Sequence, residues 1–308
     1  MTLVLVTGAT GTVGSSVARL VQERGMQVRA FVRDARRAAS ALGSDVDLAV
    51  GDLADPRSVA TAMKGVDRMF LACANHPRQF EYEVNAIDAA TARGIEGIVK
   101  LSAVGAEIGS PLEFWDTQGR IEQHLSASGV PAVVMRPTTY MTGVLAAAGT
   151  VSELGKLFVP AGQAPIAMIH PRDVADVAAI AVDSGRWEGR TLTLTGPEAL
   201  TYGQIADHLS AVLDRPVAYI DVPDDQARSN LLAAGLPDWL VTNLVTLFGL
   251  IREGVMSETT DTVQAVTGRP ARSFLEFATE FAGAFITPRT AAPPRSADSA
   301  PHPDSEHA

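Results

Sequence analysis

The stretch that decides the fold is residues 3–17, which read LVLVTGATGTVGSSV. Its first four residues are apolar, as in a strand that is buried on both faces of a sheet. Gly8 interrupts this run, and an amphipathic stretch with Val13 and Val17 on its apolar side follows. A strand, a glycine-rich turn and a helix form the phosphate-binding corner of a doubly wound dinucleotide fold. The stretch therefore predicts a nucleotide site near the start of the chain.

The three glycines of this turn have separate roles in such a fold. Gly8 permits the tight turn, Gly11 lets the backbone approach a pyrophosphate, and Gly14 lets the helix pack closely on the strand. Free N–H groups at the start of the helix then face the anion. The spacing is G-x-x-G-x-x-G, which differs from the G-x-G-x-x-G of the common dehydrogenases.

The composition limits the classes of protein to consider. The chain has 308 residues, of which 46% are hydrophobic and 19% charged, so it can bury a substantial core. The net charge of −10 and the lack of a basic run argue against nucleic acid as a partner. The single cysteine, Cys73, excludes an internal disulfide. The longest apolar stretch, residues 240–251, is too short to span a bilayer, and we expect a cytoplasmic protein that does not bind membranes.

The order of elements predicts an α/β protein with a Rossmann-type, doubly wound parallel sheet. We expect a smaller, mostly helical substrate lobe toward the carboxyl terminus. The predicted division is an NAD(P)-binding core over 1–140 with returning segments near 166–195, a mixed lobe over 141–286 and a disordered tail over 287–308. Predicted strands lie at 27–33, 46–50, 67–72, 97–102, 130–135, 191–195 and 217–220; predicted helices lie at 12–24, 35–42, 79–93, 111–127, 171–182, 202–213, 225–234, 237–252, 258–266 and 274–284.

Arg33 ends the second predicted strand, where this fold meets the adenosine ribose. An acidic residue there would bind the 2′-hydroxyl of NAD, whereas a guanidinium can pair with the 2′-phosphate of NADP. We therefore predict NADP(H), with a solvated loop arginine as the alternative. Asp34 is a candidate cap for the next helix, and Thr201 is a candidate cap for the helix expected over 202–213.

The ends of the third and fourth strands supply further candidates. Asp52 is placed to take the adenine amino group, and Asp55 is expected to cap the helix that Pro56 opens. His76 follows the fourth strand and is expected to be a solvated loop residue.

Together these residues resemble the atypical short-chain dehydrogenase/reductases of the NmrA-like group, which includes NADPH-dependent quinone oxidoreductases and redox-sensing regulators. The resemblance runs from Thr2 to about Gly283. It is carried by the segments TGATGTVG (7–14), FVR (31–33), GDL (51–53), SGVP (128–131), MRP (135–137), HPRDVA (170–175) and LTGPEALT (194–201).

The resemblance implies a cofactor site, a substrate side and a structural role for Asp173 near the domain junction. The implied cofactor-binding residues are Gly8, Thr10, Gly11, Thr12, Val13, Gly14, Arg33, Asp52, Leu53, Ala72, Cys73, Ala74, Ser102, Gln118 and Pro137. The implied substrate pocket contains Asn75, Phe114, Trp115, Tyr140, Met141 and His170, each of which is, taken singly, as well explained by core packing.

One chemical element of short-chain reductases is missing. These enzymes use a Tyr-x-x-x-Lys pair, in which the lysine lowers the pKa of the tyrosine so that the phenol can pass a proton. The only lysines are Lys64, Lys100 and Lys156, and none has a tyrosine four residues before it. Phe114 and Gln118 stand at the matching place, and neither exchanges a proton near neutral pH.

Two functions follow from this departure. A quinone becomes aromatic when it takes up a hydride, so an apolar pocket that aligns the rings suffices. The first hypothesis is NADPH-dependent reduction of a quinone or similar conjugated aromatic acceptor by a monomer or homodimer. The second is a non-catalytic NADP(H)-binding redox sensor. Residues with metal-ligand spacing are absent from the sequence, and no metal is expected.

Overall fold

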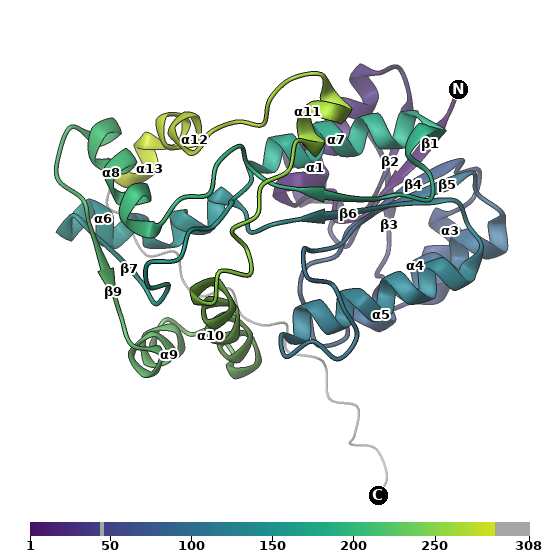
Figure 1. Ribbon diagram of the computed structural model, residues 1–308. Coiled ribbons are helices and arrows are strands. Elements are labelled where there is room, and N and C mark those ends of the chain that lie inside the picture. Colours follow the sequence, from purple (N-terminus) through teal and green to yellow (C-terminus); the bar gives the residue numbers. More distant parts are fainter. Residues whose placement is uncertain (44–45, 287–308) are drawn as a thin grey trace, which may run out of the picture.

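The computed structural model describes residues 1–43 and 46–286 (Figure 1). Residues 44–45 and 287–308, and with them the tail expected to be disordered, lie outside this description. The described chain forms a sheet covered by helices on both faces, with a smaller lobe on the left of Figure 1. No helix in this part of the chain has the length and apolarity needed to cross a membrane.

The main sheet is parallel throughout, and the predicted doubly wound α/β fold is confirmed. The strand order reverses between β1 and β4, which creates the crevice where ligands bind in such sheets. In spatial order the strands are β3 (Asp47–Val50), β2 (Gln27–Val32), β1 (Leu3–Val6), β4 (Arg68–Leu71), β5 (Gly97–Leu101), β6 (Ala132–Pro137) and β8 (Thr191–Leu194).

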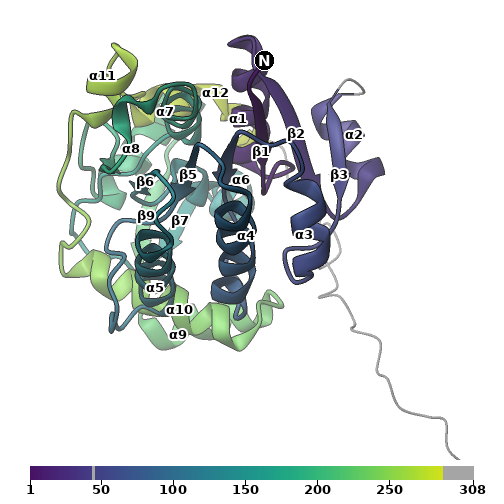
Figure 2. The same cartoon turned by 90° about the vertical axis from the view of Figure 1, so that its right-hand side faces the viewer.

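Two layers of helices bury the two faces of this sheet (Figures 1 and 2). Along β1, Val4 and Val6 join the core on one face, whereas Leu5 joins the core on the other. This alternation is the period of two expected for a central strand. The first face is covered by α1 (Thr12–Glu23) and α7 (Pro171–Asp183), and the second by α3 (Pro56–Ala62), α4 (Gln79–Arg93) and α5 (Glu113–Ser128).

Helix starts follow the capping residues seen in the sequence. Asp34 accepts hydrogen bonds from the backbone N–H groups of the first turn of α2 (Ala35–Leu42), and Asp55 accepts one from Arg57 N at 3.0 Å, with Pro56 at the first position of α3. The predicted caps at both helices are thus confirmed. So is Thr201, whose side chain forms a capping box with Gln204 at the start of α8 (Tyr202–Leu213).

The smaller lobe has its own core and a two-stranded parallel sheet of β7 (Lys156–Val159) and β9 (Ala218–Asp221). A hydrophobic cluster of buried residues such as Leu157, Ile205 and Phe277 holds it together. Its helices are η1 (Met141–Ala147), α6 (Ala148–Leu154), α8, α9 (Asp224–Ala233), α10 (Asp238–Arg252), α12 (Phe274–Glu280) and α13 (Ala282–Ile286); α11 (Thr262–Thr267) packs on α7, and the short η2 (Gly185–Trp187) precedes β8.

Three predictions differ from the structure by more than one or two residues. The pattern predicts no element over 141–159, where η1, α6 and β7 form, because Gly143, Gly149 and Gly155 obscure the apolar periodicity. The helix expected over 258–266 begins only at Thr262. The helix expected over 274–284 is two short helices, α12 and α13.

Candidate functional site: the carboxyl edge of the parallel sheet

The glycine corner after β1 is the first part of the site. Thr7 is buried, and its Oγ1 donates to Ala72 O at 2.8 Å, which ties the end of β1 to the end of β4. Gly8 has φ +60°, a left-handed conformation that favours glycine. A Cβ on Gly14 would lie 2.2 Å from Gly8 O, so only glycine fits where α1 meets the turn. The backbone of the corner therefore requires the glycines that the sequence shows.

The start of α1 is open to an anion. Gly11 is the residue before the helix, and no side chain caps the first-turn N–H groups. The first turn also contains no acidic residue that would repel a phosphate. These donors, next to the close turn at Gly8, fit a pyrophosphate. Thr10, Gly11 and Thr12 lie here, and Val13 packs beneath them in the core.

The residues that the sequence predicts for the adenosine half lie at the ends of β2 and β3. Arg33 is exposed directly after β2, so its guanidinium lies at the carboxyl edge. Asp52 Oδ1 accepts from Ala54 N at 2.9 Å, which uses one carboxylate oxygen within its own turn. Ser58 Oγ closes that turn by donating to Asp52 O at 2.9 Å, and Leu53 O accepts from Asn85 Nδ2 at 2.8 Å.

The segment after β4 carries small side chains. Ala72 is buried, Cys73 is half-buried, and Ala74 and Asn75 are exposed. Burial, followed by the nearby Glu83 carboxylate, raises the pKa of the Cys73 thiol to about 12, so the thiol stays protonated at neutral pH. His76 is exposed in the loop, as expected, and stacks on Tyr82.

A buried polar cluster lies behind the end of β5, on the face covered by α4 and α5. Lys100 Nζ donates to Gln118 Oε1 at 2.7 Å and lies 2.7 Å from Glu83 Oε2. The Lys100–Glu83 approach is an ion pair that is not aligned as a hydrogen bond. Gln79 Nε2 donates to Glu83 Oε1 at 2.9 Å. All four side chains are buried, and those of Lys100 and Glu83 are fully so.

A second polar chain joins the ends of β5 and β6. Ser102 Oγ donates to Glu122 Oε1 at 2.5 Å, and Arg136 holds both oxygens of the same carboxylate through Nε and Nη2. This two-point hydrogen bonding raises the pKa of Arg136. Pro137 ends β6 and is buried. The buried polar cluster and this second group of hydrogen bonds place Gln118 and Ser102 at the carboxyl edge, close to the end of β4.

The residues expected on the substrate side differ in how deeply their side chains are buried. Phe114 is half-buried and meets Trp239 of α10 edge to face, with ring centres 6.2 Å apart. Tyr140 is half-buried, and burial raises the pKa of its phenol. Trp115, Met141 and His170 are buried.

Two of those buried residues have visible packing roles. The indole of Trp115 lies against Gly105, where a Cβ would come within 2.5 Å of its ring. His170 Nδ1 accepts from Arg172 N at 3.1 Å and caps α7, while its ring packs on Phe277. Burial lowers the pKa of His170, although Glu280 opposes that shift.

Asp173 has the structural role that the resemblance implied. Its carboxylate is buried and accepts from the backbone N of Arg272 at 2.8 Å, and it also pairs with the Arg272 guanidinium. The contact joins the start of α7 to the segment before α12. Burial raises the pKa of Asp173, a shift that the Arg272 contacts reduce.

Sequence reasoning overlooked two groups of residues at this edge. One is the Lys100–Glu83 pair, for which the signal is a lysine inside the apolar strand GIVKL. The other is on α10, where Asn243 Oδ1 accepts from Phe114 N at 3.3 Å and Asn243 Nδ2 donates to Glu113 Oε2 at 3.1 Å. Nothing local in the sequence indicates that α10 meets α5, because the two helices are more than a hundred residues apart.

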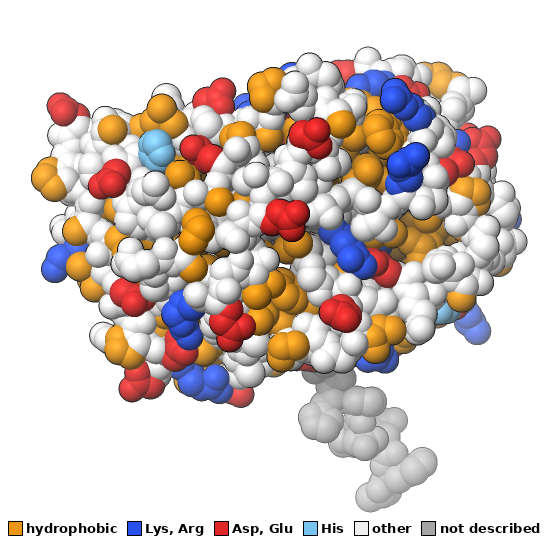
Figure 3. All heavy atoms as spheres, in the orientation of Figure 1, with side chains coloured by type: hydrophobic (Ala, Val, Ile, Leu, Met, Phe, Trp, Pro, Cys, Tyr) orange, Lys and Arg blue, Asp and Glu red, His pale blue; other side chains and the backbone are white. Residues whose placement is uncertain are grey.

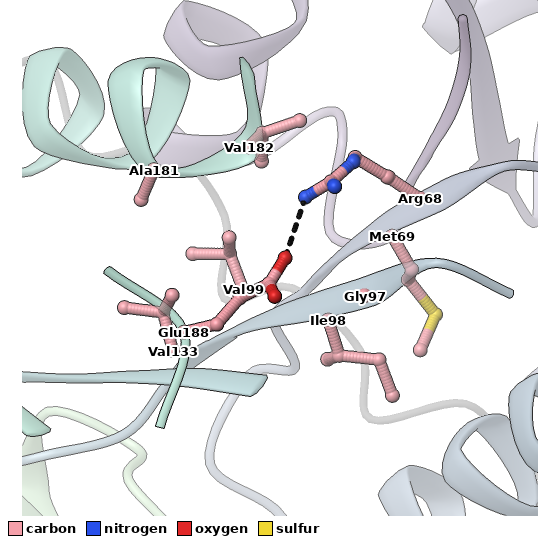
Figure 4. A pocket seen from close by; sticks show the side chains of 9 residues that line it. All are labelled: Arg68, Met69, Gly97, Ile98, Val99, Val133, Ala181, Val182 and Glu188. Atoms are coloured by element: carbon pink, nitrogen blue, oxygen red, sulfur yellow. Dashed lines mark hydrogen bonds and ion pairs between the residues drawn. The ribbon is translucent and has the colours of Figure 1, made fainter. Parts of the chain in front are cut away.

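A small cavity elsewhere in the sheet is not part of this site. It encloses about 10 Å³, roughly the space of one water molecule (Figure 4). Arg68 and Gly97, which line it, begin β4 and β5, so it lies at the amino ends of the strands. Arg68 Nη1 pairs with Glu188 Oε1 at 3.2 Å beside it. Ligands of doubly wound sheets bind at the opposite edge.

The family of the chain follows from comparison with known proteins. The NmrA-like family model matches residues 1–278. The chain belongs to the NmrA-like family. The resemblance inferred from the motifs is thereby confirmed over nearly all of the described residues.

Two relatives match along almost their whole length. The NAD(P)H azoreductase of Xenophilus azovorans is 35% identical over 283 residues, which are 92% of this chain and 99% of that protein. The (4-alkanoyl-5-oxo-2,5-dihydrofuran-3-yl)methyl phosphate reductase of Streptomyces griseus subsp. griseus is 36% identical over 284 residues, with the same coverage of 92% and 99%.

Solved structures give the same fold. The NADPH-dependent quinone oxidoreductase of Escherichia coli, complexed with NADPH, matches with a TM-score of 0.83 and 26% identity, covering 91% of this chain and 99% of that one. The triphenylmethane reductase of Citrobacter sp., complexed with NADP(H), matches with a TM-score of 0.81 and 21% identity, covering 92% and 100%.

Proposed function

We propose that this NmrA-like protein transfers a hydride from NADPH to a flat, conjugated aromatic acceptor such as a quinone. It is an NAD(P)H-dependent oxidoreductase, like the azoreductase and the reductase to which it is 35% and 36% identical over the matched residues. The observation that carries the finer proposal is the open glycine corner, together with the edge-to-face contact of Phe114 with Trp239 of α10.

The residues present fit the cofactor. The absence of a Cβ at Gly14 lets α1 come this close to Gly8, and the uncapped first turn of α1 offers N–H groups to the pyrophosphate. We assign the 2′-phosphate to Arg33 and the adenine amino group to Asp52. The nicotinamide half is assigned to the strand ends at Ser102, Gln118 and Pro137. When bound, NADPH supplies the hydride.

The acceptor is assigned to the boundary between the two halves of the molecule. Phe114 of α5 and Trp239 of α10 meet there, and Asn243 fixes the backbone of Phe114. Hydrophobic side chains reach the surface beside α10 near the middle of the molecule (Figure 3). Aromatic walls bind planar rings by stacking and by excluding water. In this division residues 1–140, with 166–195, hold the cofactor and the lobe over 141–286 shapes the acceptor side.

The acceptor class follows from the missing acid. Tyr140 and Cys73 have raised pKa values, and Gln118 does not titrate, so none of them delivers a proton readily at neutral pH. A simple ketone needs that proton as its oxygen becomes an alkoxide. A quinone becomes an aromatic hydroquinone anion, which water protonates. Conjugated acceptors are thus the substrates that this edge supports.

The test is steady-state oxidation of NADPH with a panel of several quinones, an azo dye, a simple ketone and an aldehyde. The proposal expects turnover of at least one conjugated acceptor and poor turnover of the ketone and aldehyde. Efficient ketone reduction would contradict it by requiring a general acid at the site.

The competing function is a non-catalytic NADP(H)-binding redox sensor, which the absence of a Tyr-x-x-x-Lys pair favours. The same panel separates the two. Tight binding of NADPH, with no turnover of any acceptor, would support the sensor and overturn the reductase.

A further inference from the structure

The stability of the fold does not explain why the Lys100–Glu83 pair is buried here. Both side chains are fully buried, and removing two charges from water costs several kcal/mol that their attraction does not reliably return. Replacing a buried ion pair by apolar residues of similar volume is often neutral or stabilising in proteins. Lys100 lies near the end of β5, directly behind the carboxyl edge. We therefore consider a role for the pair at the site.

The pair controls the orientation of an amide. Lysine has only donors, so the side chain of Gln118 must turn its carbonyl oxygen toward Lys100 Nζ. The other Lys100 contacts, to Leu101 O at 2.5 Å and to Glu83, hold the ammonium in place. Because Oε1 faces inward, the amide nitrogen Nε2 of Gln118 faces the other way.

That nitrogen lacks a protein partner and is open to solvent. Within the described residues, Gln118 makes one side-chain hydrogen bond, the one that Oε1 accepts. Among the described residues, the side-chain nitrogen and oxygen atoms that are buried and lack a hydrogen-bond partner are Glu83 Oε2, Thr139 Oγ1 and His170 Nε2. Gln118 Nε2 is not one of these atoms, so it is unpartnered but accessible to solvent. A residue that is only 6% exposed thus keeps an accessible donor at the carboxyl edge.

The surroundings indicate which ligand takes this donor. Lys100 of β5 pairs with Leu71, the last residue of β4, so the cluster lies beside the end of β4. Gln118 is one helical turn beyond Phe114 on α5, and Lys100 precedes Ser102 by two residues. The donor is thus several strands away from the Arg33 side of the site, on the side where the nicotinamide half of the cofactor is assigned.

We infer that Lys100 and Glu83 are positioning residues that present Gln118 Nε2 as a hydrogen-bond donor to the hydroxyls of the nicotinamide ribose. The inference rests on the proposed cofactor site. Lys100 acts through Gln118 and does not itself touch the ligand. Glu83, braced by Gln79, balances the ammonium charge so that Lys100 can stay buried.

The experiment compares binding of NADPH with binding of 2′,5′-ADP, which carries the adenosine half and the 2′-phosphate but no nicotinamide ribose. Gln118→Leu removes the donor and should weaken NADPH binding by about two- to tenfold, the usual range for one neutral hydrogen bond. Its affinity for 2′,5′-ADP should not change. Gln123→Leu, which removes an exposed amide from the same helix α5, is the control and should alter neither affinity.

The positioning role is tested by removing the pair. Lys100→Met with Glu83→Leu should lower the affinity for NADPH relative to 2′,5′-ADP, as Gln118→Leu does. Added to Gln118→Leu, it should cause no further loss, because both changes act through one amide. If that double variant does not fold, Lys100→Gln with Glu83→Gln is the alternative, since neutral amides no longer dictate the orientation of Gln118.

The outcomes distinguish a failure of the proposed cofactor site from a failure of the positioning role of the pair. A wild type that binds neither ligand would overturn the proposed cofactor site and this inference with it. A wild type that binds both ligands, with an unchanged affinity ratio in the Gln118 and pair variants, would overturn this inference alone. Additive losses, or equal losses for NADPH and 2′,5′-ADP, would show that the pair is only structural.

Discussion

The glycine corner and the proposed acceptor side are built in different ways. At the corner, the backbone conformation determines which residues fit: Gly8 has a positive φ, and a Cβ on Gly14 would collide with Gly8 O. On the acceptor side, side chains from distant segments meet, as when Phe114 of α5 contacts Trp239 and Asn243 of α10. A local site tolerates almost no substitution and is visible in the sequence. A site made by long-range contacts tolerates more and emerges only from the fold.

The largest expected effect comes from adding a side chain at the corner. Gly14→Val would place a Cβ 2.2 Å from Gly8 O, so the turn and α1 must separate. We expect loss of measurable NADPH binding and a loss of stability of about 1–3 kcal/mol, as for other overpacked positions. Cofactor titration and thermal unfolding measure the two effects.

A glycine without this constraint is the control for that variant. Gly149 lies in α6, and a Cβ there would meet nothing within 4 Å. Gly149→Ala should keep NADPH binding and should be neutral or slightly stabilising. Equal damage from both substitutions would show that the corner is not specially constrained.

The next effect concerns the choice of cofactor. Arg33→Ala should reduce the preference for NADPH over NADH by roughly ten- to a hundredfold, since a charge-assisted bond to the 2′-phosphate is worth about 1.5–3 kcal/mol. Titration of both cofactors against wild type and variant measures this. Arg93→Ala, an exposed arginine at the end of α4, is the control. A variant that keeps the wild-type preference would remove Arg33 from the site.

A smaller effect is expected in the lobe junction, where His170 caps α7 through Nδ1. Burial lowers the pKa of His170, so the unfolded chain takes up a proton first as the pH falls. Stability should therefore decrease as the pH drops below about 6.5, the ordinary value for histidine. His170→Asn keeps a capping oxygen but cannot titrate, and should flatten this dependence.

Denaturant unfolding at several pH values measures that slope. His76→Asn changes an exposed loop histidine and should leave the slope as in the wild type. An unchanged slope in His170→Asn would mean that other groups cause the loss of stability in acid.

The smallest effect is expected at Tyr140. Burial raises the pKa of its phenol, so the hydroxyl is not expected to supply a proton. Tyr140→Phe keeps the ring and should change kcat for a quinone by less than about twofold. A loss of a hundredfold or more in kcat would identify Tyr140 as a general acid that the account has missed.

These contrasts explain what the sequence could reveal. The alternation of strands and helices, the caps at Asp34, Asp55 and Thr201, and the glycine corner all depend on residues near one another in the chain, and each was predictable. The lobe segment with η1, α6 and β7 was not, because its elements are short and are stabilised by a core assembled from distant segments.

The polar residues of the site show the same limit. Gln118 was assigned through its place in a family motif, but the sequence does not reveal its partner. Lys100 and Glu83 come from a strand and a helix, and only the packing of α4 against α5 brings them together. A lysine within an apolar strand is the one local signal. It indicates neither which residue the lysine pairs with nor what the pair does.

The central claim is that the carboxyl edge supports hydride transfer without a titrating protein group. The most direct test is the pH dependence of turnover, measured from about pH 6 to 8.5, with one quinone and one simple ketone and saturating NADPH, a range that brackets the pKa values at which histidines and activated acids usually titrate. We predict a flat profile for the quinone and little or no reduction of the ketone. A bell-shaped profile with efficient ketone turnover would contradict it.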